Sequence, residues 1–563
     1  MNPIANSPFR RFVVNLGLAA LGMLLFALSF PNPLVEKGLP LAAWVAWVPV
    51  FLLAGRVSLP ASILWGALYG CGAYSLFNYW MGAFHPMAGL IINAIYTVYL
   101  ALVFPLLRLA RILFPRRFYL IQWAIWLAYE YLRTLGFLGY PYGISGYSQW
   151  EIIPVIQVAR LGGVWAVCAL VMFPSAWLGA ALGEADRPGA IPGALAGFFR
   201  REWASALCWG VCLCLALGYG IRVRGGYEDA PHARIALIQH NTDPWRGDMD
   251  EYRQNLRVLS RLSDEALRAD PKPDMVVWSE TAFVPRIYWH DNYRDDQESW
   301  ALVRELLNYL SWQEVPFVLG NDDARLEGDG RGGWERVDYN AVLLFEGAEL
   351  RDLYRKLHLV PFTEYFPYER QFPMIYEALV KADTHFWKKG KEAVVFSVDV
   401  SRPGGPGTLK FSTPICFEDT FGYLSREFVR NGAELIVNLT NDAWSHSLPA
   451  QNQHLTMAVF RAVENNRAMV RSTASGQTCG INPDGRVIAL APPFTESWLT
   501  VEVPVLTGGT TLYTARGDYL GGFFVALAAA LLILGAVFRI LFNIKKLIPP
   551  RKETGSSARR SFV

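Results

Sequence analysis

Hydrophobic and polar positions divide the chain into three stretches. Residues 1–227 are mostly apolar and rich in Trp, Tyr and Leu. Residues 228–505 alternate short apolar runs with polar segments, and residues 506–563 hold one more apolar run and a basic tail. This pattern predicts an N-terminal membrane domain of about seven helices, a separate α/β domain, and a C-terminal membrane helix with a basic tail.

A membrane-spanning helix needs roughly 20 mostly apolar residues. Eight segments approach this pattern: 12–30, 39–55, 62–83, 88–107, 118–135, 161–182, 205–222 and 519–541. The first resembles a signal peptide because Arg10 and Arg11 precede it, but its apolar core is long and a poor cleavage site follows at 30–33. We therefore predict that it is retained as an anchor.

Basic residues in the short loops predict the orientation of the spans. With eight crossings, the basic clusters fall on one side: Arg10 and Arg11, Arg56, Arg108 to Arg117, Arg187 to Arg201, and Lys545 to Lys552. Arg222 and Arg224 are exceptions. Both termini are therefore predicted to be cytoplasmic, with residues 228–505 on the opposite side.

Two features of the membrane part are unusual. Residues 136–149 are rich in Gly, Tyr and Pro, which predicts either an interfacial or re-entrant segment or a plain aromatic surface loop. Glu130 and Arg133 share one helix face within a predicted span, where charges are costly. A structural ion pair is the favoured interpretation, and a direct substrate contact is the alternative.

Charge and cysteine content exclude several classes of protein. A net charge of +3 is too small to indicate nucleic-acid binding. Five of the seven cysteines lie in apolar stretches, and only Cys416 and Cys479 lie in polar sequence. The spacing shows no disulfide framework and no zinc-ligand pattern, so no metal site is predicted. A disulfide between Cys416 and Cys479 stays open.

The middle stretch reads as a layered α/β domain. Strand-like runs lie at 234–239, 275–278, 316–319, 341–345, 409–411, 435–439 and 468–471. Helical patterns lie near 249–269, 297–312, 421–431 and 450–466.

Three short segments at strand ends could perform chemistry. They are Val276–Thr281 with Glu280, Tyr354–Phe362 with Lys356, and Pro414–Asp419 with Cys416. A free thiol is mostly protonated at neutral pH, and a nearby ammonium or helix N-terminus favours the thiolate. A buried Glu can accept its proton, and a Lys can hold an oxyanion. Taken alone, each residue is more typical of packing, capping or surface charge than of catalysis.

The order of these three motifs resembles the nitrilase or carbon–nitrogen hydrolase superfamily. Several spans before the domain and one after it resemble the apolipoprotein N-acyltransferase family. The resemblance implies an αββα sandwich beside a multi-span helical membrane domain. It also implies Glu280 as general base, Lys356 as oxyanion partner and Cys416 as nucleophile.

The same resemblance implies roles for neighbouring residues. Glu364 matches a supporting carboxylate, Phe417 would donate its backbone N–H, and Glu418 would act close to the thiol. Phe417 departs from the Tyr that is common in the family. Trp444, and more loosely Trp245, match aromatic residues on the substrate side, although ordinary packing explains them equally well.

The implied function is a two-step acyl transfer in a bacterial inner membrane, with the α/β domain periplasmic. A phospholipid, by resemblance phosphatidylethanolamine, donates the acyl chain, and a diacylated apolipoprotein accepts it. Neither a cofactor nor nucleic acid is implied, and a monomer is expected.

Two alternatives use the same sequence differently. One is a membrane-tethered amidase of the nitrilase type acting on a small C–N substrate, and the other is a scaffold without catalysis. The apolar run Ala282–Trp289 and the aromatic run Tyr365–Tyr368 favour lipid entry over the amidase. Retention of Glu, Lys and Cys argues against the scaffold.

Overall fold

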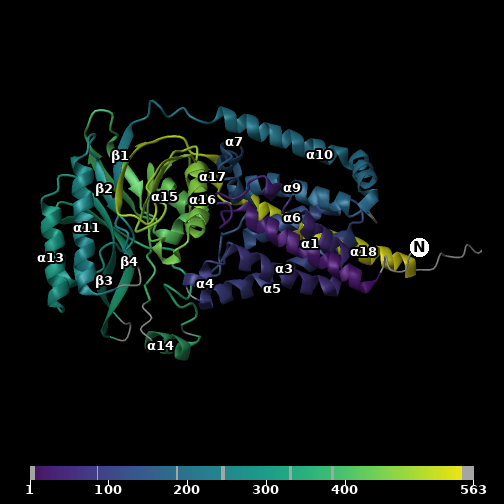
Figure 1. Cartoon of the computed structure of the whole chain (residues 1–563), viewed down its shortest axis with the longest axis horizontal. Coiled ribbons are helices and arrows are strands. Elements are labelled where there is room, and N and C mark those ends of the chain that lie inside the picture. The colour runs from purple at the N-terminus through teal and green to yellow at the C-terminus, as the bar shows by residue number, and fades with distance from the viewer. Residues whose placement is uncertain are drawn as a thin grey trace, which may run out of the picture.

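The computed structural model describes residues 7–84, 86–185, 188–242, 247–328, 332–369, 371–381 and 386–547. Figure 1 shows an elongated molecule, with a bundle of apolar helices along the long axis and an α/β domain at one end. This arrangement confirms the predicted fold class, a helical membrane domain joined to an α/β domain.

Helices lie within all eight apolar segments. They are α1 (Pro8–Ser29), α2 (Val48–Arg56), α3 (Leu59–Phe77), α5 (Pro86–Leu113), α6 (Phe118–Leu132), α9 (Val164–Leu182), α10 (Ile191–Arg222) and α18 (Tyr519–Leu547). Five helical stretches of the described chain are long and apolar enough to cross a membrane: Pro8–Ser29, Met87–Leu113, Val164–Leu182, Pro188–Arg222 and Tyr519–Asn543. The count of eight crossings stays a prediction.

The predicted span 39–55 differs most from a continuous helix. A 3-10 turn at Ala42–Trp44 precedes α2, which has only nine residues. Pro49 lies in the first turn of α2, where its missing N–H is tolerated, and it prevents the helix from continuing back toward Trp44. At 1.5 Å per residue α2 rises about 14 Å, roughly half of the hydrocarbon core of a bilayer.

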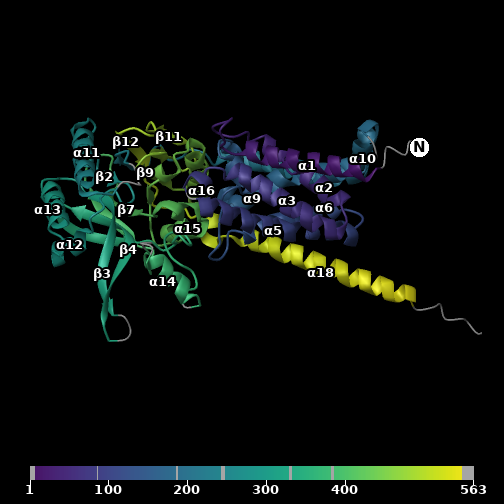
Figure 2. The same cartoon turned by 60° about the horizontal axis from the view of Figure 1, so that its bottom comes forward.

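The N-terminal end and the end of α18 both lie at the end of the bundle remote from the α/β domain (Figures 1 and 2). Arg539 of α18 donates to the carbonyl of Ile112 (2.7 Å), and Arg108 of α5 donates to the carbonyl of Gly55 (2.7 Å). The basic ends of α2, α5 and α18 therefore lie together, as the loop charges predict.

The α/β domain contains two six-stranded sheets. One has the order β12-β1-β2-β3-β4-β5 and the other the order β11-β10-β9-β8-β7-β6. Strands β1, β2 and β3 are parallel, as are β7, β8 and β9, and antiparallel strands flank both sets. The strand bounds are β1 His232–Gln239, β2 Met275–Trp278, β3 Phe317–Gly328, β4 Trp334–Glu346, β5 Glu349–Arg355, β6 Val395–Val400, β7 Gly407–Ser412, β8 Leu435–Thr440, β9 Ala468–Thr473, β10 Cys479–Ile481, β11 Val487–Leu490 and β12 Ser497–Pro504.

The two sheets pack face to face, and helices cover both outer faces. A core of residues from both sheets, including Ile235 and Phe411, fills the space between them. Helices α11 (Met249–Arg268) and α13 (Gln297–Ser311) pack on the first sheet. Helices α15 (Gly422–Arg430) and α16 (Leu448–Asn465) lie on the second. This is the predicted αββα sandwich.

Helix α16 joins the two parts of the molecule. Its apolar residues belong to the same core cluster as those of the membrane bundle, and it is buried from Ala450 to Asn465. A helix covered on every side carries no solvent-facing polar stripe. The second sheet therefore rests on the bundle through α16.

Candidate active site

Three loops bring the predicted carboxylate and ammonium groups together. Glu280 lies two residues after β2, Lys356 follows β5 directly, and Cys416 begins the 3-10 turn η5 (Cys416–Thr420) after β7. Lys356 Nζ lies 3.4 Å from Glu280 Oε1 and 2.6 Å from Glu364 Oε1. Lys356 thus contacts both predicted carboxylates, Glu280 and Glu364.

Lys356 is held as a charged ammonium inside the protein. Its side chain is fully buried. Burial lowers the pKa of Lys356, but the carboxylates of Glu364 and Glu280 outweigh it, so the pKa lies above its ordinary value. Burial likewise raises the pKa of Glu364, against the opposing charge of Lys356. A buried cation beside a reaction centre is suited to holding negative charge that develops there.

Two asparagines that the sequence reasoning missed as site residues fix Glu280. Asn340 Nδ2 donates to Glu280 Oε1 (2.9 Å), and the backbone N–H of Asn441 donates to Glu280 Oε2 (3.0 Å). Asn340 lies on β4, one residue before the predicted strand run at 341–345. Its carbonyl also accepts from the backbone N–H of Lys356 (2.9 Å). One residue therefore positions both members of the Glu–Lys pair.

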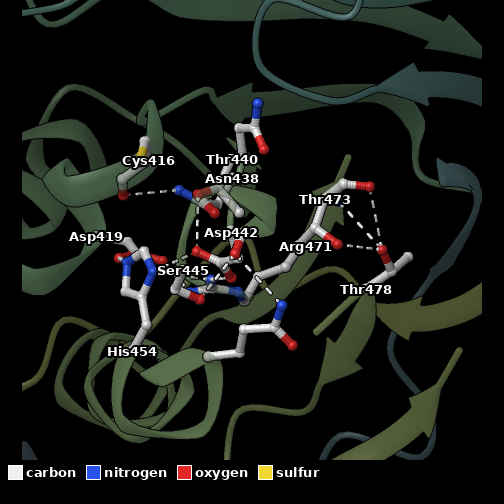
Figure 3. Close-up of polar contacts among 12 residues, drawn as sticks. Cys416, Asp419, Asn438, Thr440, Asp442, Ser445, His454, Arg471, Thr473 and Thr478 are labelled. Atoms are coloured by element: carbon white, nitrogen blue, oxygen red, sulfur yellow. Dashed lines mark hydrogen bonds and ion pairs between the residues drawn. The ribbon is translucent and has the colours of Figure 1, made fainter. Parts of the chain in front are cut away.

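The Cys416 backbone adopts a left-handed conformation, with φ of 49°. Such a conformation costs a residue with a side chain about 1–3 kcal/mol and persists only where the surroundings enforce it. Asn438 Nδ2 donates to the carbonyls of Pro414 (3.1 Å) and Cys416 (3.4 Å), as Figure 3 shows for Cys416. The strain and its supports mark this turn as a functional feature.

Glu418 clamps the Cys416 turn to the Lys356 loop. Its buried carboxylate accepts backbone N–H groups from Ile415 (2.7 Å), Leu357 (2.6 Å) and His358 (2.9 Å), and the hydroxyl of Tyr354 (2.8 Å). Burial raises the pKa of Glu418 to about 7, against the opposing effect of the backbone N–H groups. Its contacts position the other groups, and a direct role near the thiol stays a prediction.

The thiol of Cys416 is protonated at rest. Burial and the Glu280 carboxylate raise the pKa of Cys416 well above its ordinary value, and Lys356 lowers it by less. The sequence led us to expect that the ammonium would favour the thiolate, and here burial outweighs that effect. Forming the thiolate needs a base, and Glu280, whose charge acts on this thiol, is the candidate base.

The turn η5 (Cys416–Thr420), which holds the proposed nucleophile and is called the nucleophile turn below, is reached from the membrane domain by the segment 136–149. Residues 139–149 of this segment are buried, so the prediction of a plain aromatic surface loop is wrong. The ring of Tyr142 stacks on Phe417 with centroids 6.5 Å apart and lies 6.2 Å from the ring of His454. An element of the bundle thus packs against the residue that follows Cys416.

Glu130 and Arg133 hold this segment instead of pairing with each other. Glu130 accepts from the backbone N–H (3.0 Å) and hydroxyl (2.7 Å) of Ser145. Arg133 Nη1 donates to the carbonyl of Tyr142 (2.8 Å) and the hydroxyl of Tyr96 (2.6 Å). The favoured ion pair does not form, because each charge finds partners in the folded-back segment.

The predicted substrate-side aromatics lie in different settings. Trp444 packs on Trp80 of the membrane domain, with ring centroids 5.4 Å apart. Trp245 lies outside the described residues. The apolar run Ala282–Trp289 is not a lipid-entry loop, because Phe283 and Ile287 are buried in the core beneath α13. For Trp444, substrate contact stays a prediction.

A cavity of about 460 Å³ lies between the two parts of the molecule. Residues that follow α6, residues of the Lys356 loop, and residues at and after the end of η5 line it, among them Phe137, His358, Tyr365 and Thr420. The Tyr365–Tyr368 run, predicted to favour lipid entry, borders it, and Tyr368 packs on Phe137 (centroids 5.1 Å).

Cys416 and Cys479 are both free thiols.

Comparison with known proteins agrees with this architecture. Residues 234–511 match the carbon–nitrogen hydrolase family, and residues 22–177 match the apolipoprotein N-acyltransferase N-terminal domain. The chain is 46% identical to apolipoprotein N-acyltransferase 1 of Treponema pallidum, over 93% of this chain and 96% of that protein. This chain belongs to the apolipoprotein N-acyltransferase family.

A second relative and a solved structure resemble the chain to different degrees. Apolipoprotein N-acyltransferase 1 of Treponema denticola is 44% identical, over 94% of this chain and 97% of that protein. An amidase from Nesterenkonia sp. is 17% identical, over 53% of this chain and 99% of that chain, with a TM-score of 0.35. Membership of the apolipoprotein N-acyltransferase family confirms the resemblance and the acyltransferase class predicted from the sequence.

In the part of the chain that the structure describes, no group of three or more His, Cys, Asp and Glu side chains is placed to hold a metal ion. The charged groups around Cys416 are instead paired with one another.

Proposed function

We propose that this protein transfers a fatty acyl chain from a phospholipid, through a thioester on Cys416, to a lipoprotein. The acceptor is the free α-amino group of an N-terminal diacylglyceryl-cysteine, and the donor is phosphatidylethanolamine. The contact of Tyr142 with Phe417 carries the proposal, because it sets the nucleophile turn against the membrane bundle, where lipid substrates arrive. Membership of the family supports it.

In the first step, Glu280 takes the thiol proton of Cys416 as the sulfur attacks the ester carbonyl carbon. The ammonium of Lys356 and the backbone N–H of Phe417 hold the tetrahedral oxyanion; losing one such donor typically costs about 3–4 kcal/mol. The intermediate collapses by breaking the ester C–O bond. Glu280 returns its proton to the departing alkoxide, which leaves a lysophospholipid and the thioester.

In the second step, the α-amine attacks the thioester carbonyl and Glu280 accepts a proton from the nitrogen. The same donors hold the second oxyanion. The C–S bond breaks, the sulfur takes the proton back from Glu280, and an amide is released. A donor and an acceptor that are both anchored in a bilayer need a site at its surface, which the bundle supplies.

The same proposal includes a location. The protein spans a bacterial inner membrane, with the α/β domain periplasmic and both termini cytoplasmic, and acts as a monomer. The clustering of basic helix ends remote from the α/β domain supports this orientation.

The test uses the full-length protein in phosphatidylethanolamine vesicles. We expect mass spectrometry to find an acyl adduct on the Cys416 peptide that hydroxylamine removes and a diacylated lipopeptide with a free N-terminus discharges. Cys416→Ala abolishes the adduct, whereas the control Cys71→Ser, at an exposed membrane cysteine, leaves it unchanged.

Two results would overturn the proposal. If water discharges the adduct as fast as the lipopeptide does, the protein is a hydrolase of the amidase type. If the Cys416→Ala variant still forms N-acylated lipopeptide, the thioester is not on the pathway.

A further inference from the structure

A closed ring of four buried charged side chains lies behind the nucleophile turn. His454 Nε2 is 2.6 Å from Asp419 Oδ1, and His454 Nδ1 is 2.9 Å from Asp442 Oδ1. Arg471 completes the ring by donating to the second oxygen of each carboxylate, with Nη2 3.2 Å from Asp442 Oδ2. Figure 3 shows this ring beside Cys416.

The geometry fixes the charge of the ring. His454 Nδ1 also lies 3.4 Å from Arg471 Nη2, but both nitrogens of His454 lie closer to carboxylate oxygens, at 2.6 and 2.9 Å. Ionised carboxylates only accept hydrogen bonds, so these contacts favour a proton on each nitrogen. Two carboxylates, an imidazolium and a guanidinium then sum to zero. The side chains of His454 and Arg471 are almost fully buried, so solvent cannot replace either positive charge.

Four elements that are distant in sequence contribute one member each. Asp419 belongs to η5, three residues after Cys416, and Asp442 follows Asn441, whose N–H holds Glu280. His454 comes from α16 and Arg471 from β9. The ring therefore connects the turn of the nucleophile to the loop of the base.

We propose that His454 is a positioning residue for the acyl transfer, which, by bridging Asp419 and Asp442, holds Cys416 and Glu280 in register and neutralises the charge behind the thiol. The inference rests on the proposed role of Cys416. The hydrogen bonds that the described structure gives the His454 ring go to Asp419, Asp442 and Arg471, and none goes to Cys416.

The surrounding charges support a positive charge on His454 at neutral pH. Burial lowers the pKa of His454, but Asp419 and Asp442 outweigh burial and Arg471, and the pKa is raised to about 9. The other groups near the ring are Tyr142 from the bundle and Cys479 on β10. The charge of Asp442 also raises the pKa of Cys416, so the charge of this ring affects the thiol.

A series of charge variants tests the proposal through the reactivity of Cys416 itself. Full-length protein in detergent is alkylated with iodoacetamide from pH 6 to pH 10, and mass spectrometry quantifies the Cys416 peptide. This reaction needs no lipid, so its outcome is separate from that of the acyl-transfer test. His454→Gln gives the ring a net charge of −1, Asp442→Asn gives +1, and the double variant restores zero.

We expect His454→Gln to slow alkylation near neutral pH by about tenfold, equivalent to one pKa unit, with the difference vanishing at high pH. Asp442→Asn should react at least as fast as the unchanged protein, and the double variant should fall between the two single variants. His290→Gln, which alters a part-buried contact between His290 on helix α12 (Ile287–Tyr293) and Asp295, is the control and should have no effect.

Two outcomes would overturn the proposal. One is a pH profile for His454→Gln that matches the unchanged protein. The other is a double variant slower than His454→Gln at every pH, which indicates lost structure without a charge effect. If His454→Gln does not fold, the alkylation rate of Asp442→Asn is compared with that of the double variant. A faster rate for Asp442→Asn supports the proposal, and equal rates refute it.

Discussion

Replacing Glu418 with Gln would test how the nucleophile turn is held. The carboxylate of Glu418 accepts four donors, with Oε1 facing the N–H groups of Leu357 and His358 and Oε2 facing the N–H of Ile415. Gln keeps the shape of the side chain but turns one acceptor into an NH₂ donor. Whichever way the amide lies, at least one backbone N–H then faces another donor.

The amide orientation of lower free energy keeps the carbonyl oxygen facing the N–H groups of Leu357 and His358 and turns the NH₂ toward Ile415. A buried donor without an acceptor costs about 1–3 kcal/mol. The strain falls on Ile415, immediately before the left-handed Cys416. Because a shift of about 1 Å at a reacting group can cost about 100-fold in rate, we expect Glu418→Gln to slow acyl-enzyme formation by roughly 10- to 100-fold.

The assay measures the first-order rate at which the Cys416 peptide gains an acyl chain in phospholipid vesicles. Tyr354→Phe removes the fourth donor but leaves the three backbone bonds, so it should lose only about 0.5–3 kcal/mol of stability and little rate. Glu427→Gln, an exposed substitution on α15, is the charge-matched control and should leave the rate unchanged.

The reasoning fails if Glu418→Gln acylates as fast as the unchanged protein. It also fails if Tyr354→Phe is as slow as Glu418→Gln, because the phenol and not the backbone clamp would then position the turn.

Three further predictions follow from the same contacts. Lys356→Met leaves two buried carboxylates without their cation, so it should destabilise the protein by about 3–5 kcal/mol in thermal or denaturant unfolding and abolish the acyl adduct. Asn340→Ala removes a bond to the Glu280 carboxylate worth about 1.5–3 kcal/mol, and should slow acylation, whereas the exposed Asn308→Ala should not. Because the pKa of Glu418 rises from 4.5 to about 7 on folding, the folded chain keeps a proton that the unfolded chain releases. Stability should therefore fall as pH rises from about 4.5 to about 7, and Glu418→Gln should flatten this slope in melting curves.

The sequence predicted the elements that form the core of the domain and missed those at its edges. All seven apolar runs lie in strands, because strands buried on both faces read as continuous apolar sequence, and six of the seven are in the parallel sets. Strand β5 was not predicted, because Glu349 to Arg355 is mostly polar and half exposed at a sheet edge. The pattern also placed a full span over α2, where hydropathy does not register the helix start imposed by Pro49.

At the site, motif order located Glu280, Lys356 and Glu364, but not what holds them. Asn340 lies on a strand that reads as scaffold, and its contact with the site depends on a partner 60 residues away. No local pattern encodes such pairings. Glu130 and Arg133 show the reverse error, since helical spacing predicted a pair that the folded-back segment 136–149 separates.

The helical bundle contacts the candidate site through Tyr142 and α16. Helix α16 carries His454 toward the nucleophile turn, and its other contacts lie on the bundle. Glu464 accepts from the N–H of Val164 at the start of α9 (2.9 Å), and Arg461 donates to the hydroxyl of Tyr147 (3.1 Å). Because these bonds and a shared apolar core fix α16, the register of the charged ring depends on the bundle. An α/β sandwich of this family cut from its helices would lose the surface against which its own nucleophile turn is aligned.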